Sequence, residues 1–271
     1  MTKVSLSSKV IRHFRAYLAL VRFSLSRTLE FRFDFFFRFI MDCVFYALSI
    51  AFFEILFLHT NTLAGWGRHE ILLFLAGGLL IDGVFMTMMA RNLWEFPSLV
   101  NKGELDFHII RPVSTIFFVL TRNFEFASFM NVLVALGIMI YAINMFPDPL
   151  TFYQILGYVF LLLNGLVLMI CLRLFTVLPV FWTHSDLGFH MLYMSIDQVT
   201  ERPEVIFRGI SHLIFTTIFP FIIMTSFPAR WFFGTLTWPE FTYAVALSAI
   251  FISIVAWVWK RGLKIYSSAS S

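Results

Sequence analysis

The sequence predicts an all-α polytopic membrane protein with about six transmembrane helices, preceded by an amphipathic helix at the membrane interface. Of its 271 residues, 59% are hydrophobic and 13% are charged, whereas a soluble domain carries about 25% charged residues. Several windows of about 20 residues contain almost no charge, which is the length needed to cross the hydrocarbon layer. The 36 phenylalanines fit this class, because phenylalanine is favourable at the centre of an inserted helix.

The N-terminal unit, residues 1–34, is predicted to be a basic amphipathic helix on the cytoplasmic leaflet. Residues 1–38 contain eight basic and two acidic side chains, so their net charge of +6 exceeds the +4 of the whole chain. Apolar residues recur there at spacings of three and four, as in an amphipathic helix, at Val10, Phe14, Tyr17, Val21 and Leu25. Arginines on its other face would meet lipid phosphates. A helix packed on a soluble partner is the alternative, but the span that follows directly favours the membrane surface.

The transmembrane domain is predicted to occupy residues 35–260. Hydropathy identifies five clear spans, at Phe35–Leu58, Ile71–Ala90, Ile116–Ile143, Phe152–Trp182 and Phe241–Trp259. Basic residues near span ends mark the cytoplasmic side, and they occur both in the N-terminal unit and in the tail, residues 261–271. Two cytoplasmic termini require an even number of crossings, and six is the natural count. By parity, the charged stretch 101–114 then lies on the cytoplasmic side.

Residues 183–239 allow two readings. Hydropathy alone places the fifth span at about Val205–Phe227, but the segment before it would then be cytoplasmic despite its acidic character. In the second reading, Leu187–Val199 belongs to a polar fifth span, and residues 203–235 form a re-entrant segment bent at Pro220. Non-helical backbone at membrane depth requires cover by protein. We favour the second reading.

Ionisable residues inside the apolar runs are the strongest candidates for a role in the membrane. A charge at the bilayer centre costs about 2.5–3.5 kcal/mol on insertion scales, so these side chains should face protein or water: Asp42, Glu54, Asp82, Arg122, Glu125 and Arg173. The spacings predict that Arg122 pairs with Glu125 and that Arg38 pairs with Asp42. Either these residues line a translocation path or proton relay, or they tie helices together. We favour the second role for Arg122 and Glu125 and leave Asp82 open.

Motifs for catalysis, nucleotide binding and metal binding are missing from the sequence. It contains no G-x-x-x-x-G-K-[ST] loop for ATP, no HExxH and no GxSxG, so we expect no catalytic residues. His184, Asp186 and His190 are close in sequence, but offsets of two and six do not converge on one helix face, and we expect no metal site there. Both cysteines lie in apolar runs, which argues against disulfides.

The stretch "NKGELDFHIIRPVS", Asn101–Ser114, is short, carries both charge signs and contains Gly103 and Pro112. A short helix from Arg91 to Leu99 is predicted to precede it, with its register disturbed by Pro97. A simple cytoplasmic turn could be much shorter. A compact polar projection between two spans therefore suggests a surface on which a soluble partner docks and transmits movement.

Three segments together resemble the type-2 ABC exporter permeases, in the six-span branch whose members often occur as paired membrane subunits. These segments are "KGELDFHIIRPVS", "ERPEVIFRGISHLIFTTIFPF" and "VWKRGLKIYSSAS". The resemblance implies a dimer of identical or paralogous permeases carried on two copies of a separate ATPase subunit, which binds ATP and magnesium. This chain would then need no cofactor of its own.

The resemblance also implies a coupling helix at about residues 92–108 that is seated in a groove of the ATPase. Its expected coupling residues are Glu95, Lys102, Gly103, Glu104, Leu105, Asp106, Arg111 and Pro112. Asp42, Asp82, Arg122 and Glu125 remain the expected pathway or interhelical residues.

The expected function is that of a non-enzymatic permease subunit of an ATP-driven exporter in the cell inner membrane, in contact with lipids and not with nucleic acid. An ion-driven secondary transporter is one alternative, but it predicts internal repeats, of which the sequence shows no convincing example. A lipid-handling membrane enzyme is the other alternative.

Overall fold

The described residues are helical almost throughout, which confirms the all-α prediction. The computed structural model describes residues 17–26, 32–63, 65–110, 114–146, 149–184, 207 and 209–266. A short helix at Tyr17–Ser26 comes first. The following elements are α2 (Arg32–Phe57), α3 (Arg68–Phe85), the π-helix η1 (Met86–Ala90), α4 (Arg91–Asn101), α5 (Asp106–Ile109), α6 (Thr115–Thr121), α7 (Phe126–Asn144), α8 (Phe152–Val177), α9 (Val180–Thr183), α11 (Ile210–Thr217), α12 (Phe221–Phe232) and α13 (Trp238–Ile265).

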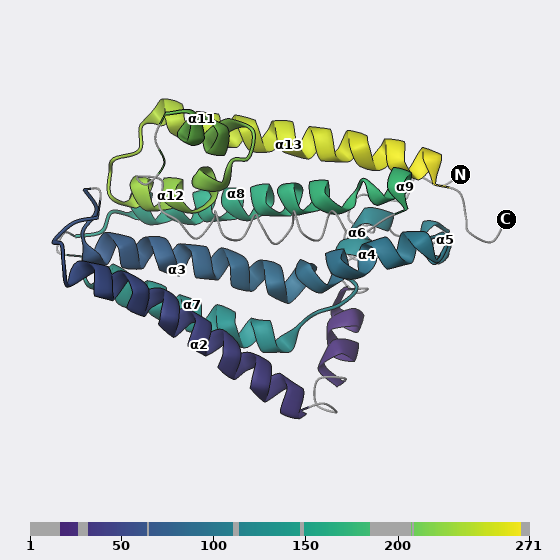
Figure 1. The fold of residues 1–271 in the computed structure, drawn as a ribbon, viewed down its shortest axis with the longest axis horizontal. Coiled ribbons are helices and arrows are strands. Elements are labelled where there is room, and N and C mark those ends of the chain that lie inside the picture. Colours follow the sequence, from purple (N-terminus) through teal and green to yellow (C-terminus); the bar gives the residue numbers. More distant parts are fainter. Residues whose placement is uncertain are drawn as a thin grey trace.

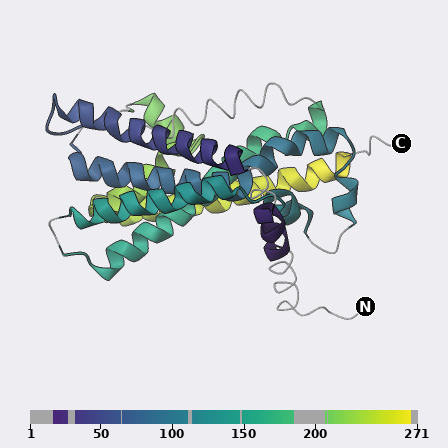
Figure 2. The ribbon, with the colours of Figure 1, turned by 90° about the horizontal axis from the view of Figure 1, so that it is seen from below.

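Five helical runs among the described residues are long and apolar enough to cross a membrane, and a bent pair makes a sixth if it counts as one span. The chain is therefore a multi-pass membrane protein. The long helices run side by side along one axis in both views (Figures 1 and 2). Helix α3 packs against α7, α8 and α12 and forms the centre of the bundle. Helix α2 lies at the edge and leaves most of its apolar side chains exposed.

Small residues allow α8 and α12 to approach closely. A Cβ atom on Gly165 would lie 2.4 Å from the backbone oxygen of Met224, and one on Gly157 would overlap the indole of Trp231. Membrane helices commonly pack through such small residues, because van der Waals contact replaces the hydrophobic drive available in water. Helix α12 is consequently buried over most of its length.

The later part of the chain contains a sharp bend. Helices α11 and α12 meet at 90°, with Pro220 directly before α12. The Tyr243 hydroxyl donates to the Thr216 carbonyl at 2.9 Å, and Arg230 pairs with Glu240 at 2.8 Å, so both helices lie beside the start of α13. The polar segment Leu187–Val199, on which the choice between the two sequence readings partly rests, lies outside the described residues.

Two predicted segments differ from the structure. The predicted short helix Arg91–Leu99 is not a separate element, because α3, η1 and α4 form one helical run from Arg68 to Asn101. Pro97 lies inside α4 without ending it. The third span is not continuous from Ile116, because α6 stops at Thr121 and α7 starts at Phe126. The side chain of Asn92 binds the backbone at this interruption, as described below.

Elements that are distant in sequence gather at one end of the bundle. Helix α9 contacts both α4 and α13, and α5, α6 and the last turns of α13 lie close by (Figure 1). The Tyr17–Ser26 helix lies across the bundle axis near the same end (Figure 1). The N-terminal helix, the charged stretch after α4 and the end of α13 therefore share one side of the molecule.

Candidate functional site

The charged stretch forms a compact knob at the end of α4, which we define as residues 102–110. Helix α4 ends in a Schellman motif: the Glu104 N–H donates to the Leu99 carbonyl at 3.0 Å, and the Gly103 N–H donates to the Val100 carbonyl at 3.2 Å. This motif requires a left-handed residue after the helix, and Gly103 has a φ of 72°. The chain therefore turns back sharply after α4.

Leu105 anchors the knob, because its side chain is completely buried. The ring of His108 in α5 stacks on the ring of Phe118 in α6, with centroids 4.4 Å apart. The knob is consequently packed on the bundle. We expected Leu105 to belong to the docking surface, but burial makes it the root of that surface.

The exposed part of the knob is both charged and apolar. Lys102 and Glu104 are exposed, and so are Phe107 and Ile110, with 66% and 82% of their surface accessible. Large apolar side chains next to charges at the end of a helix bundle are typical of a protein contact surface. Sequence reasoning missed Phe107 and Ile110, because apolar residues in a largely apolar chain carry no signal of their own.

The end of α13 packs against the base of the knob through an aromatic cluster. The ring centroids of Phe96 and Phe181 lie 5.5 Å apart, and each lies 5.7 Å from Trp259. Tyr266 follows α13, where burial and the negative charge of Asp106 raise the pKa of its phenol. The phenol is therefore neutral at physiological pH.

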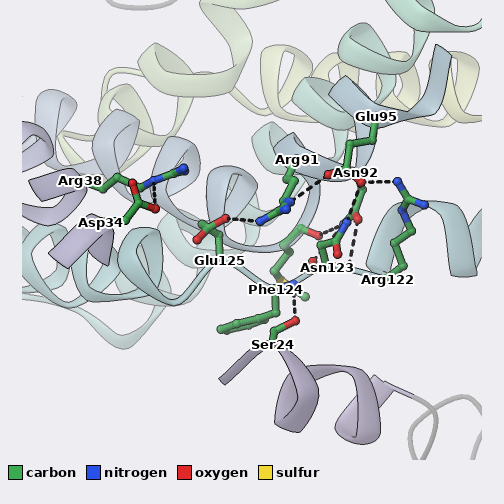
Figure 3. A network of polar contacts seen from close by, with 11 residues as sticks. Ser24, Asp34, Arg38, Arg91, Asn92, Glu95, Arg122, Asn123, Phe124 and Glu125 are labelled. Carbon is green, nitrogen blue, oxygen red and sulfur yellow. Dashed lines mark hydrogen bonds and ion pairs between the residues drawn. The ribbon is translucent and has the colours of Figure 1, made fainter. Parts of the chain in front are cut away.

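A polar network connects α4 with the interruption between α6 and α7 (Figure 3). Asn92 is fully buried. Its Nδ2 donates to the carbonyls of Met88 and Leu120, each at 2.8 Å, and of Asn123 at 3.1 Å. Its Oδ1 accepts the Asn123 N–H at 2.9 Å. One carboxamide thus binds backbone groups that a continuous helix would have paired internally.

Four charged side chains surround this carboxamide. Arg91 Nε lies 3.0 Å from Glu95 Oε1 and its Nη1 lies 3.4 Å from Glu125 Oε2. Arg122 forms a short ion pair with Glu95. Because two arginines face two glutamates, each partly buried charge has a partner of opposite sign, which offsets part of the cost of removing it from water.

The N-terminal helix joins the same network. Ser24 is buried, and its Oγ accepts the Phe124 N–H at 3.2 Å (Figure 3). Tyr17 and Val21 of the predicted apolar stripe are partly buried, and burial raises the pKa of the Tyr17 phenol. Leu25, the last residue of the stripe, is 41% exposed, so the stripe meets the bundle over only part of its length.

The two predicted ion pairs are wrong, although the interhelical role is observed. Arg122 and Glu125 do not share a helix face, because the helix is interrupted between them, and each pairs with α4 instead. Arg38 pairs with Asp34 at 2.9 Å. Asp42 instead accepts a short hydrogen bond from Asn131 of α7.

The other ionisable residues lie apart from the knob. Glu54 pairs with Arg68 where α2 and α3 meet at the far end of the bundle. Arg173 is fully buried in α8, with its guanidinium carbon 5.6 Å from the ring centre of Phe85. Asp82 is half-buried on α3, close enough to Tyr46 to interact electrostatically. The structure therefore does not line these residues up as one path.

Several predicted residues lie outside the described part of the chain, namely Arg111, Pro112, Asp186 and His190. Of the residues that are described, no group of three or more histidine, cysteine or acidic side chains could hold a metal ion. Arg91, Asn92 and Asn123 are network members that sequence reasoning missed. Arg91 also pairs with Glu95, four residues on, which is a spacing that the sequence shows. The contacts that join these residues to the interruption span 28 to 34 residues of chain, so no local spacing could reveal them.

Comparison with known proteins identifies the family. A family model described as "ABC-2 family transporter protein" matches residues 43–270. No curated protein and no solved structure gave a significant match. The matched region includes all the described spans except the start of α2, together with the knob and the network. The chain therefore belongs to the ABC-2 family of transporter membrane proteins and is a multi-pass permease.

Proposed function

We propose that this permease is the membrane-spanning subunit of an ATP-driven exporter and that its knob receives force from a separate ATPase subunit. The observation that carries the proposal is the construction of the knob. Exposed Lys102, Glu104 and Phe107 are mounted on a buried root, Leu105. A soluble partner can bind the exposed side chains of such a surface, and the buried root transmits the movement to the bundle.

The connection from the knob to the membrane is helical throughout. Helix α4 continues into α3 through η1, a run of 34 residues that is about 50 Å long at 1.5 Å per residue. This exceeds the hydrocarbon thickness of about 30 Å, so α4 projects beyond the membrane. The network around Asn92 joins α4 to α7, and a displacement of the knob would therefore reach several spans together.

The proposed complex contains two ATPase copies, which bind ATP and magnesium, and a second permease that is identical or paralogous. In the proposed orientation, both termini and the knob lie on the cytoplasmic side of the inner membrane. In support, the N-terminal helix, the knob and the end of α13 lie at the same end of the bundle (Figure 1). Glu95 lies in α4, outside the knob, and serves a different purpose from Glu104, because two arginines already engage it.

The test combines capture of the complex with charge reversal at the knob. Tagged wild-type protein taken from its native membranes should retain a P-loop ATPase at one copy per permease. Glu104→Lys should insert normally but lose transport and the stimulation of that ATPase, because the new charge alters the docking surface. Asn144→Lys is the control, since it adds a lysine at an exposed site at the end of α7 away from the knob.

Two results would contradict the proposal. One is the absence of any P-loop ATPase from the captured complex. The other is normal ATPase stimulation in the Glu104→Lys variant. Asp106→Lys serves as a second variant, with thermal unfolding measured alongside, because Asp106 also lies near Tyr266.

A further inference from the structure

The outer face of α13 carries a basic stripe that the coupling site does not use. Trp257, Lys260, Arg261 and Lys264 are all exposed. Their spacing of three, four and seven residues places them on one side of the helix. The stripe occupies the last two turns of α13, where the apolar part of the helix ends. A stripe at this height meets the headgroup layer.

Arg261 is held in place by its neighbour. Its guanidinium carbon lies 5.4 Å from the ring centre of Trp257, within the range of a cation–π contact. Stacking occupies the flat face of the guanidinium and leaves its N–H edge available to a phosphate. Within the described residues, none of the ion pairs includes Lys260, Arg261 or Lys264.

An apolar cavity of about 370 Å³ lies on the same side of α13. It is enclosed by α8, by α13 and by the bend between α11 and α12, with Phe175, Phe251, Ile254, Ile218 and Phe219 among its walls. Ile218 and Phe219 belong to the bend and are 60% and 40% exposed, and Ile254 of α13 is 40% exposed. The cavity therefore opens onto the outer surface of the bundle, and its size lies within the range of small-molecule sites.

The distance between the cavity and the stripe along α13 suits a single lipid molecule. Ile254 and Arg261 are seven residues apart, which is about two turns and about 10 Å along the helix. Half the hydrocarbon layer is about 15 Å thick, so a chain whose phosphate lies at Arg261 reaches the cavity without leaving its leaflet. We propose that α13 binds one anionic phospholipid, with its phosphate on Arg261 and Lys264 and one acyl chain in the cavity.

The charge of the stripe selects the headgroup. Three cations and no acidic residue occur from Lys260 to Lys264, which favours a headgroup with net negative charge. A zwitterionic headgroup offers the same phosphate but brings a positive group against the same cations. The lipid also touches the bend at Phe219, so its presence links the surface of the bundle to the α11–α12 pair.

The test measures lipid binding to the full-length protein by native mass spectrometry. Phosphatidylglycerol and phosphatidylcholine with identical acyl chains are the probes. Wild-type protein should retain one phosphatidylglycerol in preference to phosphatidylcholine. Arg261→Gln with Lys264→Gln should weaken phosphatidylglycerol binding by more than tenfold, because each cation near an anionic lipid contributes about a fivefold effect. Lys102→Gln, an exposed cation on the knob, is the charge control.

The cavity is tested separately by filling it. Ile254→Trp should weaken the binding of both lipids, whereas Ile252→Trp, an exposed isoleucine on another side of α13, should change neither. The proposal is overturned if the double glutamine variant binds phosphatidylglycerol as wild type does, or if the two tryptophan variants behave alike. Displacement of the lipid by excess inorganic phosphate would also overturn it, because the site would then recognise phosphate alone.

Discussion

Gly103 shows how a single residue determines the direction of the chain at the candidate site. Its φ of 72° is reached easily by glycine, whereas a Cβ atom adds about 1–2 kcal/mol in this left-handed region. Leu105, two residues later, is buried only because the chain turns back at this point. The exposed charges of the knob therefore depend on one glycine that makes no side-chain contact.

Gly103→Ala should destabilise the protein by about 1–2 kcal/mol and lower the temperature of unfolding in detergent. Gly103→Asn should cost less, because asparagine enters the left-handed region more readily than alanine. Thermal unfolding of the two variants beside wild type makes the comparison. Equal stability of the alanine and asparagine variants would show that the Schellman turn does not limit this region.

At the scale of elements, the interruption between α6 and α7 is the feature that organises the site. Asn92 binds the backbone of the interruption. Arg91 and Glu95 form ion pairs with its charged residues, Glu125 and Arg122. Ser24 of the N-terminal helix accepts a hydrogen bond from the Phe124 N–H. The Glu125 N–H also donates to the Thr87 carbonyl within η1 at 2.9 Å. Four separate segments therefore meet where the sequence predicted an unbroken span.

A double-mutant cycle on Glu95→Gln and Arg122→Gln should give a coupling free energy of about 1 kcal/mol. The expected value is at the lower end for coupled pairs, because the Glu95 side chain is 40% exposed and solvent screens the pair. Asp34 and Arg38 form the matched control, since their side chains are 62% and 53% exposed and should couple by less than about 0.5 kcal/mol. Unfolding free energies of the single and double variants supply the measurement. A coupling free energy of zero between Glu95 and Arg122 would show that this ion pair does not stabilise the site.

The elements differ in how far the sequence predicted them. Long apolar runs predicted α2 and the run of α8 and α9 to within three residues, because a span is specified by composition alone. Helix α13 continues six residues beyond its predicted end at Trp259, because its last turns are basic. Arg122 and Glu125 were assigned to one helix face, because their spacing allows it and the break does not appear in hydropathy. That break depends on Asn92, which lies about 30 residues earlier in the chain and binds it only in the folded bundle.

The site itself was predicted in part. Gly103 and the charged residues around it predicted a turn, and the structure has a turn at this position. The buried Leu105 and the exposed Phe107 could not be told apart from the sequence, because both are apolar residues in the same short segment. Their difference arises from which side of the turned chain meets the bundle.

For the whole molecule, the arrangement of ends is the main result. The knob, the N-terminal helix and the end of α13 lie together, whereas the turn between α2 and α3 lies at the other end (Figure 1). In a multi-pass membrane protein with this arrangement, the two ends of the bundle lie on opposite sides of the membrane. The proposed orientation can therefore be tested with one site at each end.

In a variant lacking Cys43 and Cys171, Lys102→Cys should resist a membrane-impermeant maleimide in intact cells and react after permeabilisation. Asn61→Cys, in the connection between α2 and α3, should react in intact cells. Both side chains are exposed, so accessibility depends on the side of the membrane and not on burial. Labelling of Lys102→Cys in intact cells would place the knob outside and remove its access to ATP-driven partners.

The unbroken helical run from Arg68 to Asn101 has a geometric consequence. A rod about 50 Å long that rocks by about 10° around its midpoint swings each tip by about 4 Å, and the two tips travel in opposite senses. Near the middle of the run, Gly83 lies against Val132 of α7 and Phe85 lies against Arg173 of α8, so these contacts can serve as the pivot. If the run moves as one body, drawing one end inward moves the other end outward.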